Sequence, residues 1–353
     1  MTVPNSPASD AGVSEQIDAL LDQFEVRRNR SLVSRILRSG LHLGLDGTDR
    51  LDLKITAAAL EEMREAFRLF QPWNAVPKVT VFGSARTEQP DPLYQHARQV
   101  AARLAEHGWM VVTGAGPGIM QAAAEGAGPE LAIGVSIRLP FEEKPSELFQ
   151  DASDDIEARL VSMKYFFTRK LMLMKESRGF VCLPGGFGTL DETFELFTLQ
   201  QTGKAEPVPI VLLDEPGGTY WRGLKRFVDD ELVTAGMVSA DDLDRALITD
   251  SVDEAVADIL DFWRNYDSLR WVGDRLVLRM RSAPTDAQLA DLNHRFGDLL
   301  AEGQIERTDP LPAEQADHDR VSLPRLVLTL RQRQVGGLYR LIRAINALSR
   351  HEF

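Results

Sequence analysis

The sequence FVCLPGGFGTLDE, residues 180–192, decides the fold that we expect. It opens with a short apolar run, Phe180–Leu183, which is typical of a buried strand. A glycine-rich turn follows, and the apolar pattern after it predicts a helix over Leu190–Gln201. A strand that is apolar throughout and leads through glycine into a helix indicates a parallel sheet covered on both faces.

The same alternation of strands and helices continues on both sides of this stretch. Further strands are predicted at Val79–Phe82, Met110–Val112, Ala132–Ile137 and Ile210–Leu213. Helices are predicted at Leu93–His107, Pro117–Ala127, Ser162–Glu176, Trp221–Leu232 and Glu254–Trp263. We therefore predict an α/β fold with a Rossmann-like, doubly wound parallel sheet, in which ligands bind beyond the carboxyl ends of the strands.

Both flanks of this region have a different character. Residues 1–12 are predicted to be a flexible tail, and residues 13–76 a helical N-terminal extension with helices near Val13–Leu41 and Ile55–Phe70. The Rossmann-like domain is assigned to residues 77–265. Residues 266–353 are predicted to form a small α+β domain with strands and helices at Leu276–Met280, Asp286–Leu300, Ile305–Arg307, Val327–Leu330 and Leu338–Leu348.

The composition excludes several functional classes. The 353-residue chain has 40 Lys and Arg against 53 Asp and Glu, a formal net charge of −13, which disfavours nucleic acid polymers as partners. No apolar run reaches the roughly 18 residues that a membrane-spanning helix needs, and the first residues do not resemble a secretory signal. Cys182 is the single cysteine, and the histidines are scattered, so we expect no disulfide and no metal site. A cytoplasmic protein that does not bind membranes is expected.

Three predicted strands end in glycine. The turns are Gly83-Ser84, Gly114–Gly118 and Pro184–Gly188. Glycine lets backbone amides approach an anion, and the N-terminus of the following helix adds a favourable dipole. Neither the dinucleotide fingerprint G-x-G-x-x-G nor the Gly-Lys-Ser/Thr ending of a P-loop is present, so a mononucleotide or sugar phosphate is the better fit.

Two sets of charged residues, Glu192 and the neighbours Arg169 and Lys170, have both a structural and a functional interpretation. Thr189–Glu192 has the form of a helix-capping box, and Ser251–Glu254 has the same form without a glycine turn before it. The preceding glycines are therefore what singles out Glu192, which they place about one turn from a bound phosphate. Arg169 and Lys170 lie in a basic helix, and their structural interpretation is a solvated face.

The turn and its surroundings resemble a known family. Residues 184–192 are similar to the P-G-G-x-G-T-x-x-E signature of the LOG (Lonely Guy) family, whose members are often labelled lysine decarboxylases. Arg169-Lys170, Gly83-Ser84 and the turn at Gly114–Gly118 extend the resemblance over roughly Lys78 to Asp214, in the manner of the longer bacterial branch. The resemblance implies a phosphoribohydrolase that cleaves the N-glycosidic bond of cytokinin riboside 5′-monophosphates or AMP, releasing base and ribose 5-phosphate.

Carried over residue by residue, the resemblance implies a catalytic pair, Arg169 and Glu192. A carboxylate can stabilise an oxocarbenium-like sugar or orient water, and a guanidinium can bind phosphate or assist the departing base. The implied phosphate and substrate contacts are Gly83, Ser84, Gly114, Gly116, Gly118, Met163, Lys170, Gly185, Gly186, Gly188 and Thr189. Met163 or Phe187 lines either a base pocket or the core. Nothing singles out Lys170 as the Schiff-base lysine that pyridoxal chemistry needs, so no cofactor is expected.

Two other functions stay open on the sequence alone. One is a non-catalytic nucleotide sensor on the same fold, although the presence of both Arg169 and Glu192 favours an enzyme. The other is an interaction protein that acts through terminal arginines, which cluster at Arg27, Arg28, Arg30, Arg35 and Arg38 and again at Arg325, Arg331, Arg333, Arg340, Arg343 and Arg350. Subunit contacts and solvated faces explain these clusters more simply than an acidic effector site does. A homodimer or higher homo-oligomer is expected.

Overall fold

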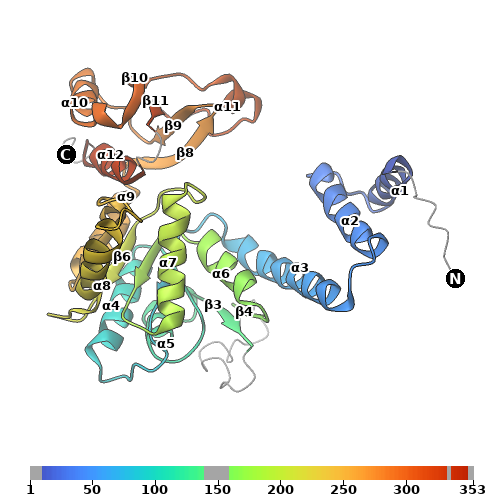
Figure 1. Ribbon diagram of the computed structural model, residues 1–353, viewed down its shortest axis with the longest axis horizontal. Coiled ribbons are helices and arrows are strands. Elements are labelled where there is room, and N and C mark those ends of the chain that lie inside the picture. Colours follow the sequence, from blue (N-terminus) through green and yellow to red (C-terminus); the bar gives the residue numbers. More distant parts are fainter. Residues whose placement is uncertain (1–9, 139–158, 332–334, 349–353) are drawn as a thin grey trace. The chain divides into compact units, whose positions relative to one another are not determined.

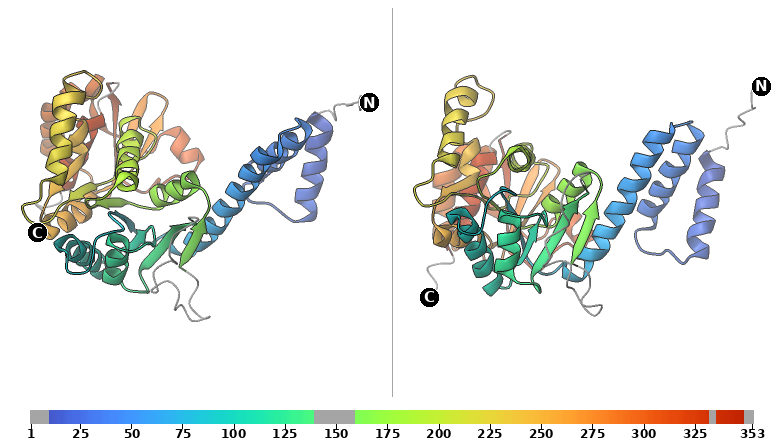
Figure 2. Two further views of the ribbon diagram at one scale, coloured as in Figure 1. Left: turned by 60° about the horizontal axis from the view of Figure 1, so that its bottom comes forward. Right: turned by 90° about the horizontal axis from the view of Figure 1, so that it is seen from below.

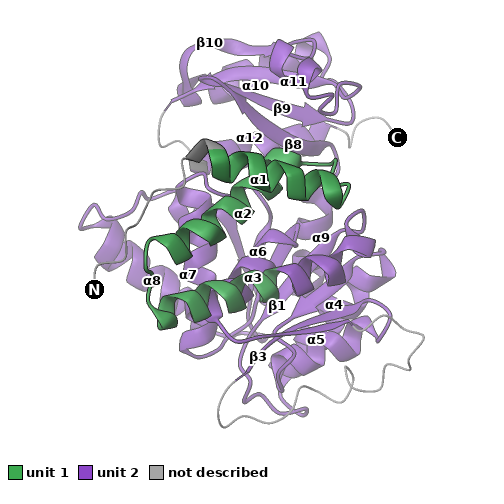
Figure 3. Ribbon diagram, turned by 90° about the vertical axis from the view of Figure 1, so that its right-hand side faces the viewer, with its two compact units in different colours: residues 1–63 green, residues 64–353 purple. Residues whose placement is uncertain are grey.

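The computed structural model describes residues 10–138, 159–331 and 335–348, and the chain divides into two compact units, Met1–Met63 and Arg64–Phe353 (Figure 3). Residues 1–9 of the predicted tail lie outside the described part. The first helix begins at Asp10, within the last three residues assigned to the tail. No helix in the described part is long and apolar enough to cross a membrane.

The first unit consists of α1 (Asp10–Gln23), α2 (Arg30–Leu45) and the first part of α3 (Arg50–Phe70). Val13, Ile17 and Leu21 recur every fourth residue, so they share one face of α1 and form a small buried cluster. Other apolar side chains of this unit are exposed, among them Leu32 at 53%, Ile36 at 51% and Leu51 at 65%. The single long helix predicted from Val13 to Leu41 is two helices, because Glu25 and Asn29 adopt left-handed backbone angles between them.

The second unit is built on a seven-stranded parallel sheet with the strand order β4-β3-β2-β1-β5-β6-β7. Its strands are β1 (Lys78–Phe82), β2 (Met110–Thr113), β3 (Ala132–Ile137), β4 (Leu160–Met163), β5 (Gly179–Cys182), β6 (Ile210–Leu213) and β7 (Ala246–Thr249). The chain runs from β1 outward to β4 on one side and from β5 outward to β7 on the other. The order therefore reverses between β1 and β5, which is where open α/β sheets bind ligands.

Helices cover both faces of this sheet (Figures 1 and 2). They are α4 (Pro92–Glu106), α5 (Ile119–Ala127), α6 (Phe166–Lys175), α7 (Phe187–Gln201), α8 (Tyr220–Phe227) and α9 (Val252–Phe262). Helix α4 packs against α5 and α9, and α6 is joined to α7 by an ion pair between Lys170 and Glu195. Right-handed crossovers in opposite directions along the sheet place α4 and α7 on opposite faces. This arrangement confirms the predicted doubly wound α/β fold.

Three strands were not predicted from the sequence, for related reasons. β4 occupies residues that were assigned to the start of a helix, and α6 begins only at Phe166. β4 is an edge strand of four residues, three of them apolar and one a serine, and so short a pattern does not separate strand from helix. β7 is equally short, and β8 (Tyr266–Val272) contains the polar residues Asp267, Ser268 and Arg270.

A four-stranded antiparallel sheet with the order β10-β11-β9-β8 follows the parallel sheet. It comprises β8, β9 (Arg275–Met280), β10 (Leu300–Arg307) and β11 (Arg325–Leu330), accompanied by α10 (Asp286–Phe296), α11 (Pro312–Ala316) and α12 (Val335–Leu348). Its helix α12 is fastened to the parallel-sheet region by Tyr339, whose hydroxyl donates to Gln200 Oε1 at 2.8 Å. The small α+β appendage is therefore present, and the predicted domain boundaries stay a prediction.

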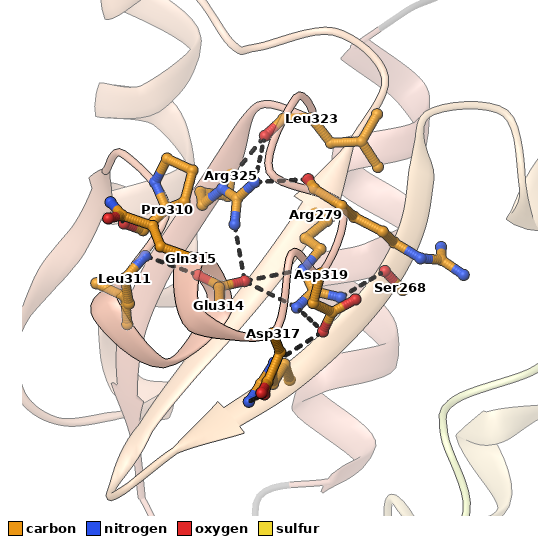
Figure 4. Close-up of polar contacts among 12 residues, drawn as sticks. Ser268, Arg279, Pro310, Leu311, Glu314, Gln315, Asp317, Asp319, Leu323 and Arg325 are labelled. Carbon is orange, nitrogen blue, oxygen red and sulfur yellow. Dashed lines mark hydrogen bonds and ion pairs between the residues drawn. The ribbon is translucent and has the colours of Figure 1, made fainter. Parts of the chain in front are cut away.

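A buried ion network holds this smaller sheet together (Figure 4). Glu314 of α11 is fully buried, and its Oε1 atom lies 2.8 Å from Arg279 Nη2 and 2.7 Å from Arg325 Nη1. Burial alone would raise the pKa of Glu314, but the Leu311 amide and the two guanidinium groups outweigh it and hold that pKa below its ordinary value. One carboxylate thus links α11 to β9 and β11.

Candidate active site at the carboxyl edge of the sheet

The three glycine turns follow β2, β1 and β5, which are neighbours in the sheet. Backbone hydrogen bonds of Ser84 tie the turns to one another. Its amide donates to the Pro184 carbonyl at 3.2 Å, and its carbonyl accepts from the Ile119 amide at 3.0 Å, where α5 begins. The three turns therefore form one connected surface at the point where the strand order reverses.

Close approach between these turns explains several of the glycines. A Cβ atom at Gly118 would lie 2.4 Å from the Ser84 carbonyl oxygen, and the φ angle of +68° also disfavours other residues there. A Cβ atom at Gly83 would lie 2.4 Å from the Ile119 side chain, and one at Gly185 would lie 2.3 Å from Thr189 Oγ1. These glycines serve the packing of the turns against each other.

Gly186 and Gly188 are different, because a Cβ atom at either position would meet nothing within 4 Å. Gly186 immediately precedes the first turn of α7, where helical amides lack partners within the helix. The open space beside these two glycines leaves room for an anion to approach the backbone. Tyr220, which the sequence did not single out, steadies the turn by donating from its hydroxyl to the Gly185 carbonyl at 2.7 Å.

Arg169 reaches the same edge from α6 and is only 8% exposed. Its Nε atom donates to the Val135 carbonyl of β3 at 3.0 Å, and its Nη1 atom lies 3.2 Å from Glu192 Oε1. Its Nη2 atom lies 2.0 Å from the position that a Cβ atom at Gly114 would take. The absent side chain at Gly114 is what makes room for the guanidinium.

Glu192 is 9% exposed on α7. Burial raises its pKa to about 7, because Arg169, which lowers it, only partly compensates for the loss of water. A carboxyl group that titrates near neutral pH suits general acid–base chemistry. The buried pair thus places a charged guanidinium beside a carboxyl group whose pKa is raised toward neutral pH.

The capping-box interpretation of Thr189–Glu192 is wrong. Helix α7 begins at Phe187, so Thr189 lies inside the first turn and Glu192 in the second. By contrast, Ser251 does cap α9, accepting from the Glu254 amide at 3.3 Å. The shared tetrapeptide therefore has two different roles, and only Glu192 points its carboxylate to a buried arginine.

Lys170 does not fit a Schiff-base lysine. Its Nζ atom lies 2.6 Å from Glu195 Oε2 and 3.1 Å from Asp191 Oδ2. The hydrogen bond to Glu195, together with that to Asp191, raises the pKa of the lysine. A nucleophilic amine must be neutral, so this environment opposes pyridoxal chemistry.

The other candidates lie at the periphery of this arrangement. Met163 is fully buried at the end of β4, whereas Phe187 is 93% exposed and so does not belong to the core. Gly116 approaches the flexible end of Met120, with 2.7 Å between Met120 Cε and a Cβ atom at that position.

Burial raises the pKa of Cys182 to about 12, which makes its thiol unreactive. Across the described ranges, no group of three or more His, Cys, Asp and Glu residues is placed to hold a metal ion.

The arginines near the C-terminus do not converge on one site. Arg325 pairs with the buried Glu314, Arg343 pairs with Asp258, and Arg340 lies 3.8 Å from Asp241. Arg333 and Arg350 lie outside the described residues. Each of these three arginines has a partner within the chain, and Arg325 is buried, so neither a subunit contact nor a solvated face explains that residue.

Comparison with known proteins places the chain in a family. The family model described as "possible lysine decarboxylase" matches residues 117–259. The chain is 30% identical over 182 residues to a cytokinin riboside 5′-monophosphate phosphoribohydrolase of Mycobacterium marinum, covering 50% of this chain and 90% of that protein. It is 29% identical to the protein of the same name from Mycobacterium tuberculosis, covering 46% of this chain and 83% of that one.

Two solved structures are also similar. A molybdenum cofactor binding protein from Rippkaea orientalis matches with a TM-score of 0.34 and 21% identity, over 51% of this chain and 93% of that one. The molybdenum cofactor carrier protein of Chlamydomonas reinhardtii matches with a TM-score of 0.32 and 23% identity, over 52% of this chain and 94% of that one. The sequence matches carry the assignment: the chain belongs to the LOG family, that of the cytokinin riboside 5′-monophosphate phosphoribohydrolases.

Proposed function

We propose that the protein is a phosphoribohydrolase that cleaves the N-glycosidic bond of nucleoside 5′-monophosphates of the AMP or cytokinin riboside type. The observation that carries this proposal is the buried Arg169–Glu192 pair, 3.2 Å apart, at the same edge of the sheet as the open glycine turn before α7. The names of the mycobacterial relatives support the same activity.

The glycine turn supplies the phosphate site in this proposal. The backbone at Gly186 and Gly188 is not shielded by neighbouring side chains, and it leads into the positive end of the α7 dipole. A phosphate held there is remote from the bond that breaks. Its binding energy therefore positions the ribose without taking part in the chemistry.

Glu192 and Arg169 supply the chemistry. As the bond between C1′ and the base nitrogen breaks, positive charge develops on the ribose, and the Glu192 carboxylate can stabilise it and accept a proton from the attacking water. Water adds to C1′, and the base leaves with the bonding electrons and takes up a proton. Arg169 stays charged throughout, holds Glu192 in place and offers its guanidinium to the substrate.

The experiment is base release from AMP, GMP, CMP and isopentenyl-AMP, followed by chromatography. Glu192→Gln and Arg169→Ala are expected to lower release at least about a hundredfold, whereas Glu254→Gln, which alters the matching glutamate of α9, is the control and should leave release unchanged. Undiminished release in the first two variants would remove the site assignment. Tight binding of a monophosphate without any release would replace the enzyme by the nucleotide sensor.

Self-association belongs to the same proposal. Exposed leucines on α2 and α3, together with Ile36, offer apolar surface that a second copy of the chain can cover. Sedimentation of the full chain tests this: a monomer at micromolar concentration would contradict it.

A further inference from the structure

A cavity of about 470 Å³ opens at the other edge of the parallel sheet, beside the amino ends of β5 and β6. Helices α6 and α7 form one side of it, and residues 204–208, Trp263, Asp267 and Arg320 form the rest. This volume is in the range of roughly 300–1,000 Å³ that is typical of small-molecule sites. None of its lining residues belongs to the glycine turns or to the Arg169–Glu192 pair.

The inner wall of the cavity is apolar and buried. Phe180 and Leu196 are each 2% exposed, and Val208 is 8% exposed. The Trp263 ring is fixed beside them, because its Nε1 atom donates to the Arg178 carbonyl at 2.8 Å. Two aromatic side chains among aliphatic ones suit a flat, apolar ligand body.

The rim of the cavity is basic although the chain as a whole is acidic. Four cations, Lys175, Arg178, Lys204 and Arg320, face two carboxylates, Glu206 and Asp267. Arg320 is already paired with Asp267, whereas neither Arg178 nor Lys204 has a carboxylate within ion-pair distance among the described residues. The Arg178 guanidinium instead lies over the Trp263 ring, 5.0 Å from its centroid.

The far side of the rim is held by the buried ion network of the smaller sheet. Arg325, which pairs with Glu314, also donates from Nη2 to the Arg320 carbonyl at 2.8 Å. Arg320 itself has a left-handed backbone, with a φ angle of +51°. A constrained backbone fixed by a buried network is typical of a built site rather than of an incidental gap.

We propose that this cavity is a binding site for a small aromatic anion, with the ring against Phe180 and Trp263 and the acidic group on Arg178 and Lys204. The site is separate from the proposed monophosphate site. It contacts the same two helices, since Leu171 follows Arg169 by two residues on α6 and Leu196 follows Glu192 by one turn on α7. A ligand there touches both elements that carry the Arg169–Glu192 pair.

The test uses two fluorescent probes that differ only in charge. One is 8-anilinonaphthalene-1-sulfonate, and the other is N-phenyl-1-naphthylamine, which lacks the sulfonate. In the full chain, Arg178→Gln combined with Lys204→Gln should weaken binding of the sulfonate at least about fivefold and that of the neutral probe less than about twofold. Ala205→Phe, which fills the cavity, should weaken both probes.

The control is Lys225→Gln combined with Arg226→Gln, which removes two cations of α8 that do not line the cavity. It should leave both affinities unchanged, and circular dichroism should show all variants folded. Equal sulfonate binding in the wild type and the Arg178/Lys204 double variant would overturn the proposal, as would unchanged binding of both probes after Ala205→Phe. Because neither probe is a nucleotide, these results do not depend on base release.

Discussion

The guanidinium of Arg169 occupies the space that a side chain at Gly114 would need: only 2.0 Å separates Nη2 from the position of a Cβ atom there. The two residues come from different parts of the chain, one from the turn after β2 and the other from α6. Their close approach couples the second glycine turn to the Arg169–Glu192 pair.

Gly114→Ala should therefore impair catalysis by displacing Arg169. A displacement of about 1 Å at a catalytic group can lower turnover about a hundredfold, and we expect a loss of that order in base release. Turnover and melting temperature should be measured together. Gly44→Ala, in open space on α2, is the control and should keep full turnover; an active Gly114→Ala variant would argue against the role of Arg169.

Base release should depend on pH through Glu192. Burial raises the pKa of Glu192 to about 7, and the proposed role requires its ionised form, so the rate should rise with pH through that value and then level off. The residual rate of Glu192→Gln should show no such step. A wild-type profile that is flat between pH 5.5 and 8.5 would contradict the assignment of Glu192 as proton acceptor.

Ionisation of Glu192 should have the opposite effect on folding stability: stability should fall as pH rises, whereas the rate of base release should increase. The pKa of Glu192 is higher in the folded protein, about 7, than the ordinary ~4.3 of an unfolded chain. Between these values the folded state binds more protons, so the wild type should lose stability relative to Glu192→Gln as pH rises. The difference in unfolding free energy should shift by about 3 kcal/mol in favour of the variant between pH 4 and pH 8. Urea unfolding at several pH values measures it, and parallel curves would refute it.

The glycines of the turns should separate into structural and ligand-contacting positions. Gly118→Ala places a methyl group against the Ser84 carbonyl at a left-handed φ angle and should cost about 1–3 kcal/mol of stability. Gly186→Ala meets no protein atom, so its melting temperature should hold while its KM for the monophosphate rises. Thermal unfolding and steady-state kinetics on both variants check this. Equal losses of stability would show that Gly186 is also structural.

The stability of the smaller sheet should depend on Glu314. Glu314→Gln removes the carboxylate that pairs with the buried Arg325 and leaves Arg279 with Asp319 alone, and breaking one partner of a buried ion pair typically costs about 3–5 kcal/mol. Urea unfolding should show this loss, whereas Glu306→Gln, at an exposed position of β10, should change little. A variant as stable as the wild type would mean that the network is not needed for folding.

The doubly wound fold was predictable because most strands of its parallel sheet are apolar almost throughout and are separated by helices. Val79–Phe82 and Ile210–Leu213 show this pattern clearly, whereas β4 and β8 mix polar and apolar positions, so local periodicity did not reveal them. Glu192 and Arg169 were identified through a family signature. Their 3.2 Å contact depends on how α6 and α7 pack, and so do the cavity beside Trp263 and the hydrogen bond from Tyr220 to Gly185. Hydrophobic periodicity reports local secondary structure, so it does not predict such contacts between distant segments.

Ser84 joins the turns after β1, β2 and β5 through main-chain atoms, while its hydroxyl accepts from the Arg86 amide at 3.1 Å. Loosening any one of these turns therefore releases a partner of the other two, and they should open as a single cooperative unit. In hydrogen exchange, the amides of Ser84 and Ile119 should then report the same opening event, at a rate that a bound monophosphate slows for both together.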